Sequence, residues 1–140
     1  MIKLFVYGTL ILPEIMRAVS GRIFLAKTCC LENYVRYLVK GEIYPGIIWC
    51  PGSKVDGVIY FDLNRQHLKI LDRFEGEMYQ REHLVVKTDD GETHHAFAYV
   101  VKPLYQHLLS NEPWNLEEFK EKYVNQFVQG YSGFRWIHSL

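Results

Sequence analysis

The sequence has few cysteines, no excess of charge of either sign and no long apolar run. It contains three cysteines among 140 residues, two of them adjacent and none in a Cys-x-x-Cys pair, which fits neither a disulfide framework nor a thiolate metal site. Sixteen basic residues balance sixteen acidic ones without a Lys/Arg run, which argues against binding to a nucleic-acid backbone or an anionic membrane. We therefore expect reduced thiols and no nucleic-acid partner.

The sequence also lacks the signals of membrane insertion and export. No apolar run reaches the roughly 18 residues that a membrane-spanning helix needs. The first residues, MIKLFVYG, show no basic leader, no long apolar stretch and no small-residue cleavage site. These features predict a cytoplasmic location and no membrane partner.

The residues that are present suit a strand-rich fold with an aromatic core. Hydrophobic residues make up 49% of the chain and aromatic residues 15%, enough for one core in a chain of this length. Strand-like patterns occur at 2–7, 22–28, 34–39, 47–49, 55–63, 82–87 and 93–101, and helical spacing at 13–20, 64–74 and about 116–128. We predict a single α+β domain over residues 1–140, with a C-terminal helix and tail from about 113, in which Trp114 is a packing anchor. Closure of six or seven short strands into a small barrel would leave no exposed edge.

One acidic residue lies where the predicted 64–74 helix should be apolar. At 100° per residue, Leu68, Leu71 and Glu75 share one stripe of that helix. Desolvation and the negative end of the helix dipole both raise the pKa of a carboxyl at this place, toward the range that serves proton transfer at neutral pH. Glu75 is therefore a candidate acid–base group. The alternative is a carboxylate that turns outward and pairs with Arg73 or Arg81.

The first predicted strand ends abruptly in a loop formed by Tyr7, Gly8, Thr9 and Leu10. Where a strand ends in this way, successive backbone N–H groups become free to point at one place, and such groups bind carboxylates or oxyanions. The alternative is an ordinary strand-to-helix turn in which Gly8 supplies an unusual backbone angle. The loop is a candidate anion-binding element.

The other candidate groups carry weaker signals. Tyr79 and Arg81 follow Glu75 closely and share one face if they begin a strand, so they are candidates to orient the carboxylate or a substrate, or else a surface pair beside the hairpin. The histidines have no metal-ligand spacing, and no metal site is predicted. Cys30 or Cys50 with a histidine would suit a thiol-dependent acyl transferase, but no local signature supports that chemistry.

Four short motifs occur along the chain in a fixed order: VYGTL at 6–10, YPG at 44–46, LDRFEG at 71–76 and MYQR at 78–81. In this combination the sequence resembles the gamma-glutamylcyclotransferase-like family, which includes the AIG2-like and gamma-glutamylamine cyclotransferase proteins. The likeness runs from residue 1 to about residue 101, and the last predicted helix resembles the C-terminal extension of plant AIG2-like members. The resemblance implies a small mixed β-barrel with surrounding helices.

The resemblance also implies an activity, the release of 5-oxoproline from a small-molecule gamma-glutamyl substrate without any cofactor. Glu75 matches the catalytic glutamate of the family, and the loop at 7–10 matches the one that holds the glutamyl part of the substrate. Tyr79 would then contact the substrate or Glu75. Arg81 would support the site without contacting the substrate. The alternative is a non-catalytic or regulatory domain that binds a small metabolite in the same pocket, because a fold alone does not fix a function.

Overall fold

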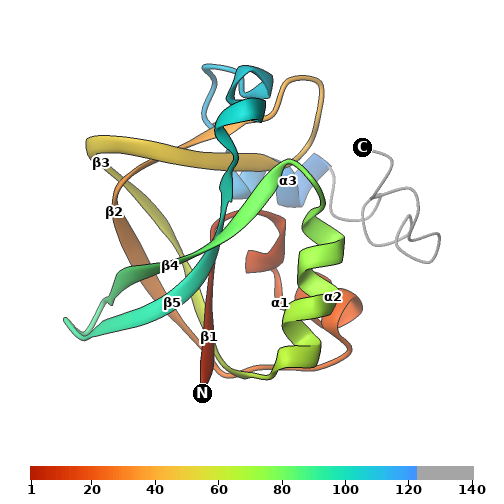
Figure 1. Ribbon diagram of the computed structural model, residues 1–140, viewed down its shortest axis with the longest axis vertical. Coiled ribbons are helices and arrows are strands. Elements are labelled where there is room, and N and C mark those ends of the chain that lie inside the picture. Colours follow the sequence, from red (N-terminus) through yellow and green to blue (C-terminus); the bar gives the residue numbers. More distant parts are fainter. Residues whose placement is uncertain (123–140) are drawn as a thin grey trace.

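The structure is a computed structural model and describes residues 1–122 of the chain (Figure 1). Its strands are β1 (Ile2–Val6), β2 (Ala26–Leu38), β3 (Pro45–Leu63), β4 (Tyr79–Thr88) and β5 (Thr93–Val101). Its helices are α1 (Pro13–Ser20), α2 (Arg65–Glu75) and α3 (Leu116–Lys122), with two 3₁₀ turns, η1 (Thr9–Ile11) and η2 (Pro103–Leu108). The predicted α+β fold is confirmed.

The strands close into a barrel in the order β1-β3-β2-β4-β5. β1 runs parallel to β5, with Leu4 beside Phe97, whereas the other paired strands are antiparallel. The small mixed barrel that the resemblance implies is therefore present. In Figure 1, α1 and α2 lie together on one side of this barrel.

The barrel strands are fewer and longer than the six or seven short strands predicted. β2 joins most of the predicted runs 22–28 and 34–39, and β3 joins 47–49 and 55–63. A Pro-Gly pair normally marks a turn, which is why the sequence favours a break after Trp49. Gly52 instead continues β3 with a φ of +88° and donates its N–H to the Oδ1 atom of Asn33 at 3.1 Å. The turn η2 was also not predicted.

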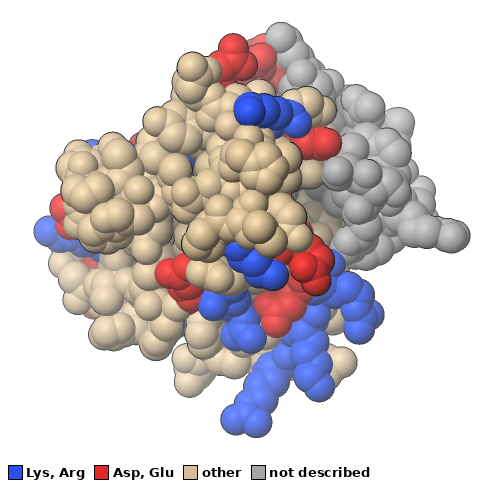
Figure 2. All heavy atoms as spheres, turned by 45° about the horizontal axis from the view of Figure 1, so that its top comes forward, with Lys and Arg blue, Asp and Glu red and all other residues tan. Residues whose placement is uncertain are grey.

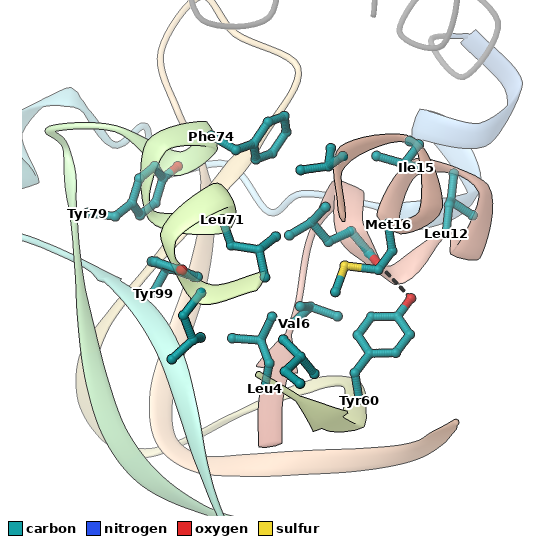
Figure 3. Packing of buried hydrophobic residues seen from close by; sticks show 14 of the residues in the cluster. Leu4, Val6, Leu12, Ile15, Met16, Tyr60, Leu71, Phe74, Tyr79 and Tyr99 are labelled. Atoms are coloured by element: carbon teal, nitrogen blue, oxygen red, sulfur yellow. Dashed lines mark hydrogen bonds between the residues drawn. The ribbon is translucent and has the colours of Figure 1, made fainter. Parts of the chain in front are cut away.

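The packing of α2 fixes where Glu75 lies. The helix begins after Asn64, whose Oδ1 accepts a hydrogen bond from the His67 N–H at 2.9 Å, while the His67 Nδ1 accepts one from the Asn64 N–H at 3.0 Å. Its buried stripe, with Leu71 fully enclosed, packs against the barrel and α1 (Figure 3). The neighbours in this cluster include Leu4, Val6, Ile15, Met16 and Tyr60. The apolar stripe thus holds the C-terminal end of α2 against the barrel.

The segment before α3 is anchored by Trp114, as the sequence predicts. Trp114 is 5% exposed, and its Nε1 donates to the carbonyl oxygen of Ile43 at 3.0 Å. Phe119 of α3 is buried beside it. The helix predicted over about 116–128 is confirmed as far as Lys122, and the rest of that helix and the tail lie outside the described residues.

The surface carries charges of both signs. On the face in Figure 2, acidic and basic side chains lie beside one another between larger uncharged areas. Within residues 1–122, the structure contains no helix whose length and apolar character would let it span a membrane.

Candidate active site

A cavity of about 460 Å³ lies beside the C-terminal end of α2. This volume falls in the range of roughly 300–1,000 Å³ that is typical of small-molecule sites. The predicted site residues on its wall are Tyr7, Gly8, Thr9, Leu10, Glu75 and Tyr79. The structure therefore brings together the loop after β1 and the end of α2, which lie far apart in the sequence.

Glu75 is the last residue of α2 and faces this cavity. Among residues 1–122, no group forms a hydrogen bond or an ion pair with its carboxylate. Desolvation raises the pKa of Glu75 to about 8, and the negative charge of Asp72 adds to the rise. A carboxyl with this pKa is mostly protonated at pH 7, yet it gains and loses a proton readily near neutrality.

Asp72, one turn earlier in α2, has the partners that Glu75 lacks. Arg81 donates from Nε to Oδ1 at 3.0 Å and from a terminal nitrogen to Oδ2 at 3.3 Å. The Tyr99 hydroxyl donates to the same Oδ1 at 2.7 Å, and the Arg81 guanidinium also lies over the Phe97 ring. Arg81 does not line the cavity and pairs with Asp72 rather than with Glu75. Arg81 therefore contacts Asp72, the neighbour of Glu75 on α2, and not the cavity.

The loop after β1 is pressed against the start of β3. A Cβ atom on Gly8 would lie 2.7 Å from the Cγ atom of Pro45, so this contact requires glycine. Arg36 also holds this loop. Its guanidinium donates to the Tyr7 carbonyl oxygen at 2.7 Å and lies 5.3 Å from the centre of the Trp114 ring. These contacts fix the loop relative to the cavity.

The backbone of this loop offers free donors. The carbonyl oxygens of Gly8 and Thr9 accept hydrogen bonds from the N–H groups of Ile11 and Leu12. The N–H groups of residues 8–10 have no acceptor within the described part of the chain. Such unused donors at a cavity wall suit an anionic ligand atom or a developing oxyanion.

The hydroxyls of Tyr7 and Tyr79 at the cavity are already engaged. Tyr7 donates to the Tyr99 carbonyl oxygen and Tyr79 donates to the Pro45 carbonyl oxygen, both at 2.7 Å. Burial raises the pKa of Tyr7 and of Tyr79 well above the usual range for tyrosine, with a further contribution from Glu75 in each case. Both hydroxyls therefore stay protonated at physiological pH, and each already donates its hydrogen bond to a backbone carbonyl oxygen.

Some residues on the wall were not singled out from the sequence. They are Lys40, Glu42, Tyr44, Pro45, Glu77, Tyr99 and Tyr105. Tyr44 and Pro45 belong to the YPG motif, so that motif was a signal that they lie at the site. Glu42, Tyr99 and Tyr105 have no comparable pattern, because they reach the cavity only through the closure of the barrel and the position of η2.

The alternative chemistries considered for the sequence find no support at this cavity. Cys30 and Cys50 are free thiols that do not line it, and burial raises the pKa of the Cys30 thiol. Within residues 1–122, no group of three His, Cys, Asp or Glu side chains is placed to hold a metal ion.

Comparison with known proteins bears on the same residues. A family model described as "Gamma-glutamyl cyclotransferase, AIG2-like" matches residues 4–118, a span that contains Glu75 and the whole cavity. The chain belongs to this family. The resemblance inferred from the four motifs is thereby confirmed, and the match covers most of the described residues.

Individual members of the family extend the comparison. AIG2-like protein D of Arabidopsis thaliana is 28% identical over 132 residues, which cover 91% of this chain and 84% of that protein. A solution structure of another Arabidopsis thaliana protein has a TM-score of 0.72 at 25% identity and covers 95% of this chain and 81% of the other. A structure named gamma-glutamyl cyclotransferase has a TM-score of 0.63 at 19% identity and covers 91% and 84% of the two chains, which shows a shared fold.

Proposed function

We propose that this protein is a gamma-glutamyl cyclotransferase that releases 5-oxoproline and an amine or amino acid from a gamma-glutamyl compound. The observation that carries the proposal is Glu75, a carboxylate without partners that faces a cavity and has a pKa raised to about 8. Membership of the family supports the same reaction. The reaction needs one group that accepts a proton and then returns it, and Glu75 fits that requirement.

In the first step, the α-amine of the substrate attacks its own γ-carbonyl carbon. Glu75 accepts a proton from the α-amine, a C–N bond forms, and a five-membered ring closes around a tetrahedral centre. The oxygen of that centre gains the negative charge, and the N–H groups of residues 8–10, which line the same cavity, would stabilise it.

In the second step, the original amide bond breaks. Glu75 returns its proton to the leaving nitrogen, the C–N bond to the leaving group cleaves, and 5-oxoproline is released. Protons balance over the two steps and no co-reactant is consumed. Because the nucleophile and the electrophile belong to one molecule, holding a conformer ready for cyclisation supplies much of the acceleration. Tyr79 contacts the substrate from the wall, and Arg81 acts through Asp72.

The test is 5-oxoproline release by the wild type and Glu75→Gln from gamma-glutamyl amino acids, gamma-glutamyl-ε-lysine, glutathione and simple gamma-glutamyl amides. We expect Glu75→Gln to lower kcat about 10²- to 10⁴-fold, the usual contribution of a general acid–base group. Glu32→Gln is the matched control, because Glu32 is exposed on β2 and does not line the cavity.

Two results would overturn this assignment. Unchanged release by Glu75→Gln would remove Glu75 from the mechanism. Absence of product from the whole panel, with folded wild-type protein, would reject the cyclotransferase. In that event, a thermal shift with glutamate-like ligands would favour the alternative of a non-catalytic metabolite-binding domain.

A further inference from the structure

Arg36 places its guanidinium on backbone carbonyl oxygens and not on a carboxylate. One of its terminal nitrogens donates to the Tyr7 carbonyl oxygen at 2.7 Å and to the Asp56 carbonyl oxygen at 3.0 Å. None of the ion pairs within residues 1–122 includes Arg36, although the charge of Asp56 attracts it from a longer distance. A half-buried cation without an ion-pair partner is unfavourable for stability, so its place beside the substrate loop calls for another explanation.

The oxygen that Arg36 binds and the Gly8 N–H belong to the same peptide group. This peptide bond is trans, so its carbonyl oxygen and its N–H point in opposite directions. Tyr7 and Gly8 line the cavity, whereas Arg36 does not. A hydrogen bond that holds the oxygen toward Arg36 therefore also fixes the direction of the Gly8 N–H, away from the guanidinium.

The other hydrogen bonds of the loop leave this peptide group free to turn. The Tyr7 hydroxyl donates to the Tyr99 carbonyl oxygen, but that bond is at the far end of the side chain. The Gly8 carbonyl oxygen accepts from the Ile11 N–H at 3.0 Å, but it belongs to the next peptide group. Among the hydrogen bonds of residues 1–122, only the one from Arg36 reaches the peptide between Tyr7 and Gly8.

The charge of Arg36 also strengthens the donor on the opposite side of the peptide. A hydrogen bond accepted by the carbonyl oxygen polarises the amide, which makes its N–H a better donor. The effect is larger when the group that donates to the oxygen is charged, and a guanidinium stays charged across the working pH range of proteins. The Trp114 ring, 5.3 Å from the guanidinium, helps to keep Arg36 in this position.

We propose that Arg36 is a positioning residue for the oxyanion. It directs the Gly8 N–H at the γ-carbonyl oxygen of the substrate and polarises it, so that this N–H stabilises the negative charge of the tetrahedral centre. The inference rests on the proposed cyclotransferase function. Arg36 itself does not touch the substrate, because it lies outside the cavity wall.

The experiment measures 5-oxoproline release by Arg36→Met, Arg36→Gln and Arg36→Lys from the gamma-glutamyl substrate that the wild type converts best. Arg36→Met and Arg36→Gln remove the charge, and we expect kcat to fall about 10- to 100-fold, less than the loss of an oxyanion donor outright. KM should change by less than about twofold, because the donor acts on charge that is present only in the transition state. Arg36→Lys keeps a charged donor and should recover most of the loss.

Two further measurements distinguish positioning from general damage to the fold. The pKa of Glu75 depends on desolvation and on Asp72 but not on Arg36, so the acidic limb of the kcat/KM profile should stay at its wild-type pH in all three variants. Arg22→Met is the matched control. Arg22 is exposed and its guanidinium also lies over an aromatic ring, that of Phe24, but it does not line the cavity, so kcat should stay at the wild-type value.

The outcomes separate this inference from the function on which it rests. Wild-type kcat in Arg36→Met and Arg36→Gln, an equal loss in Arg36→Lys, or a shifted acidic limb would overturn the role of Arg36 and leave Glu75-dependent release standing. Denaturant unfolding checks that each variant is folded, and Arg36→Gln decides the matter if Arg36→Met does not fold. No 5-oxoproline from the wild type with any substrate of the panel would overturn both proposals.

Discussion

Carboxylates in two regions of this protein have pKa values shifted in opposite directions. At the cavity, burial beside Asp72 raises the pKa of Glu75 to about 8. At the turn between β4 and β5, the Thr88 hydroxyl, the Glu92 N–H and the Lys27 ammonium all donate to Asp90 and lower its pKa to about 2. The two groups have similar chemistry, so the difference comes from their surroundings.

The two carboxylates differ in the hydrogen-bond donors that surround them. Asp90 stabilises the hairpin turn, because three residues donate hydrogen bonds to its carboxylate. Glu75 has no donor among the described residues, and its proton is bound weakly enough to leave near neutral pH. A carboxylate kept without partners in a cavity reduces stability when ionised, and it is free to exchange a proton with a ligand.

The largest expected effect on stability is at Glu75. Its folded-state pKa of about 8 lies above the unfolded value, so the folded state binds more protons between about pH 4.5 and 8, and stability falls as pH rises through that window. Glu75→Gln removes this loss and should stabilise the protein by about 2–4 kcal/mol at pH 9, with little change at pH 4. Denaturant unfolding at both pH values measures the difference. An equal difference at pH 4 and pH 9 would contradict the raised pKa.

A smaller effect is expected from Asp72, because its charge is the second cause of the raised pKa of Glu75. Asp72→Asn removes that charge while leaving an oxygen that can accept from Arg81 and Tyr99. The acidic limb of the kcat/KM profile, on which activity rises as Glu75 ionises, should therefore move to lower pH. Tyr99→Phe is the control, since it removes one hydrogen bond and keeps the charge. A profile that does not move in Asp72→Asn would show that desolvation alone sets the pKa.

The smallest effect is expected at Asp90, which is exposed. Its folded-state pKa of about 2 lies below the unfolded value, so its contribution is present above about pH 4 and is lost as pH falls toward 2. Asp90→Asn should slightly lower the Tm at pH 7, and the difference from the wild type should disappear near pH 2. The kcat for 5-oxoproline release should stay at the wild-type value. A loss of turnover would show that the hairpin turn affects the cavity.

Much of the local structure was predictable from the sequence. The helix at 64–74, its apolar stripe through Leu68 and Leu71, and the strands at 82–87 and 93–101 depend on neighbours along the chain, and all are present. The long strands were not predictable, because Gly52 continues β3 only through its bond to Asn33 on another strand. The same limit applies to η2, which has no periodic pattern of its own.

The sequence by itself determined that Glu75 ends an amphipathic helix on its apolar side and that a loop with glycine follows the first strand. Only the tertiary structure decided that Gly8 meets Pro45, that Asp72 takes Arg81 as its partner, and that Glu42 reaches the cavity wall. The physical reason is that the pKa and availability of a carboxylate depend on the solvent excluded and the donors supplied by segments far away in the chain. Helical periodicity is a property of adjacent residues, whereas the isolation of Glu75 is a property of the closed barrel.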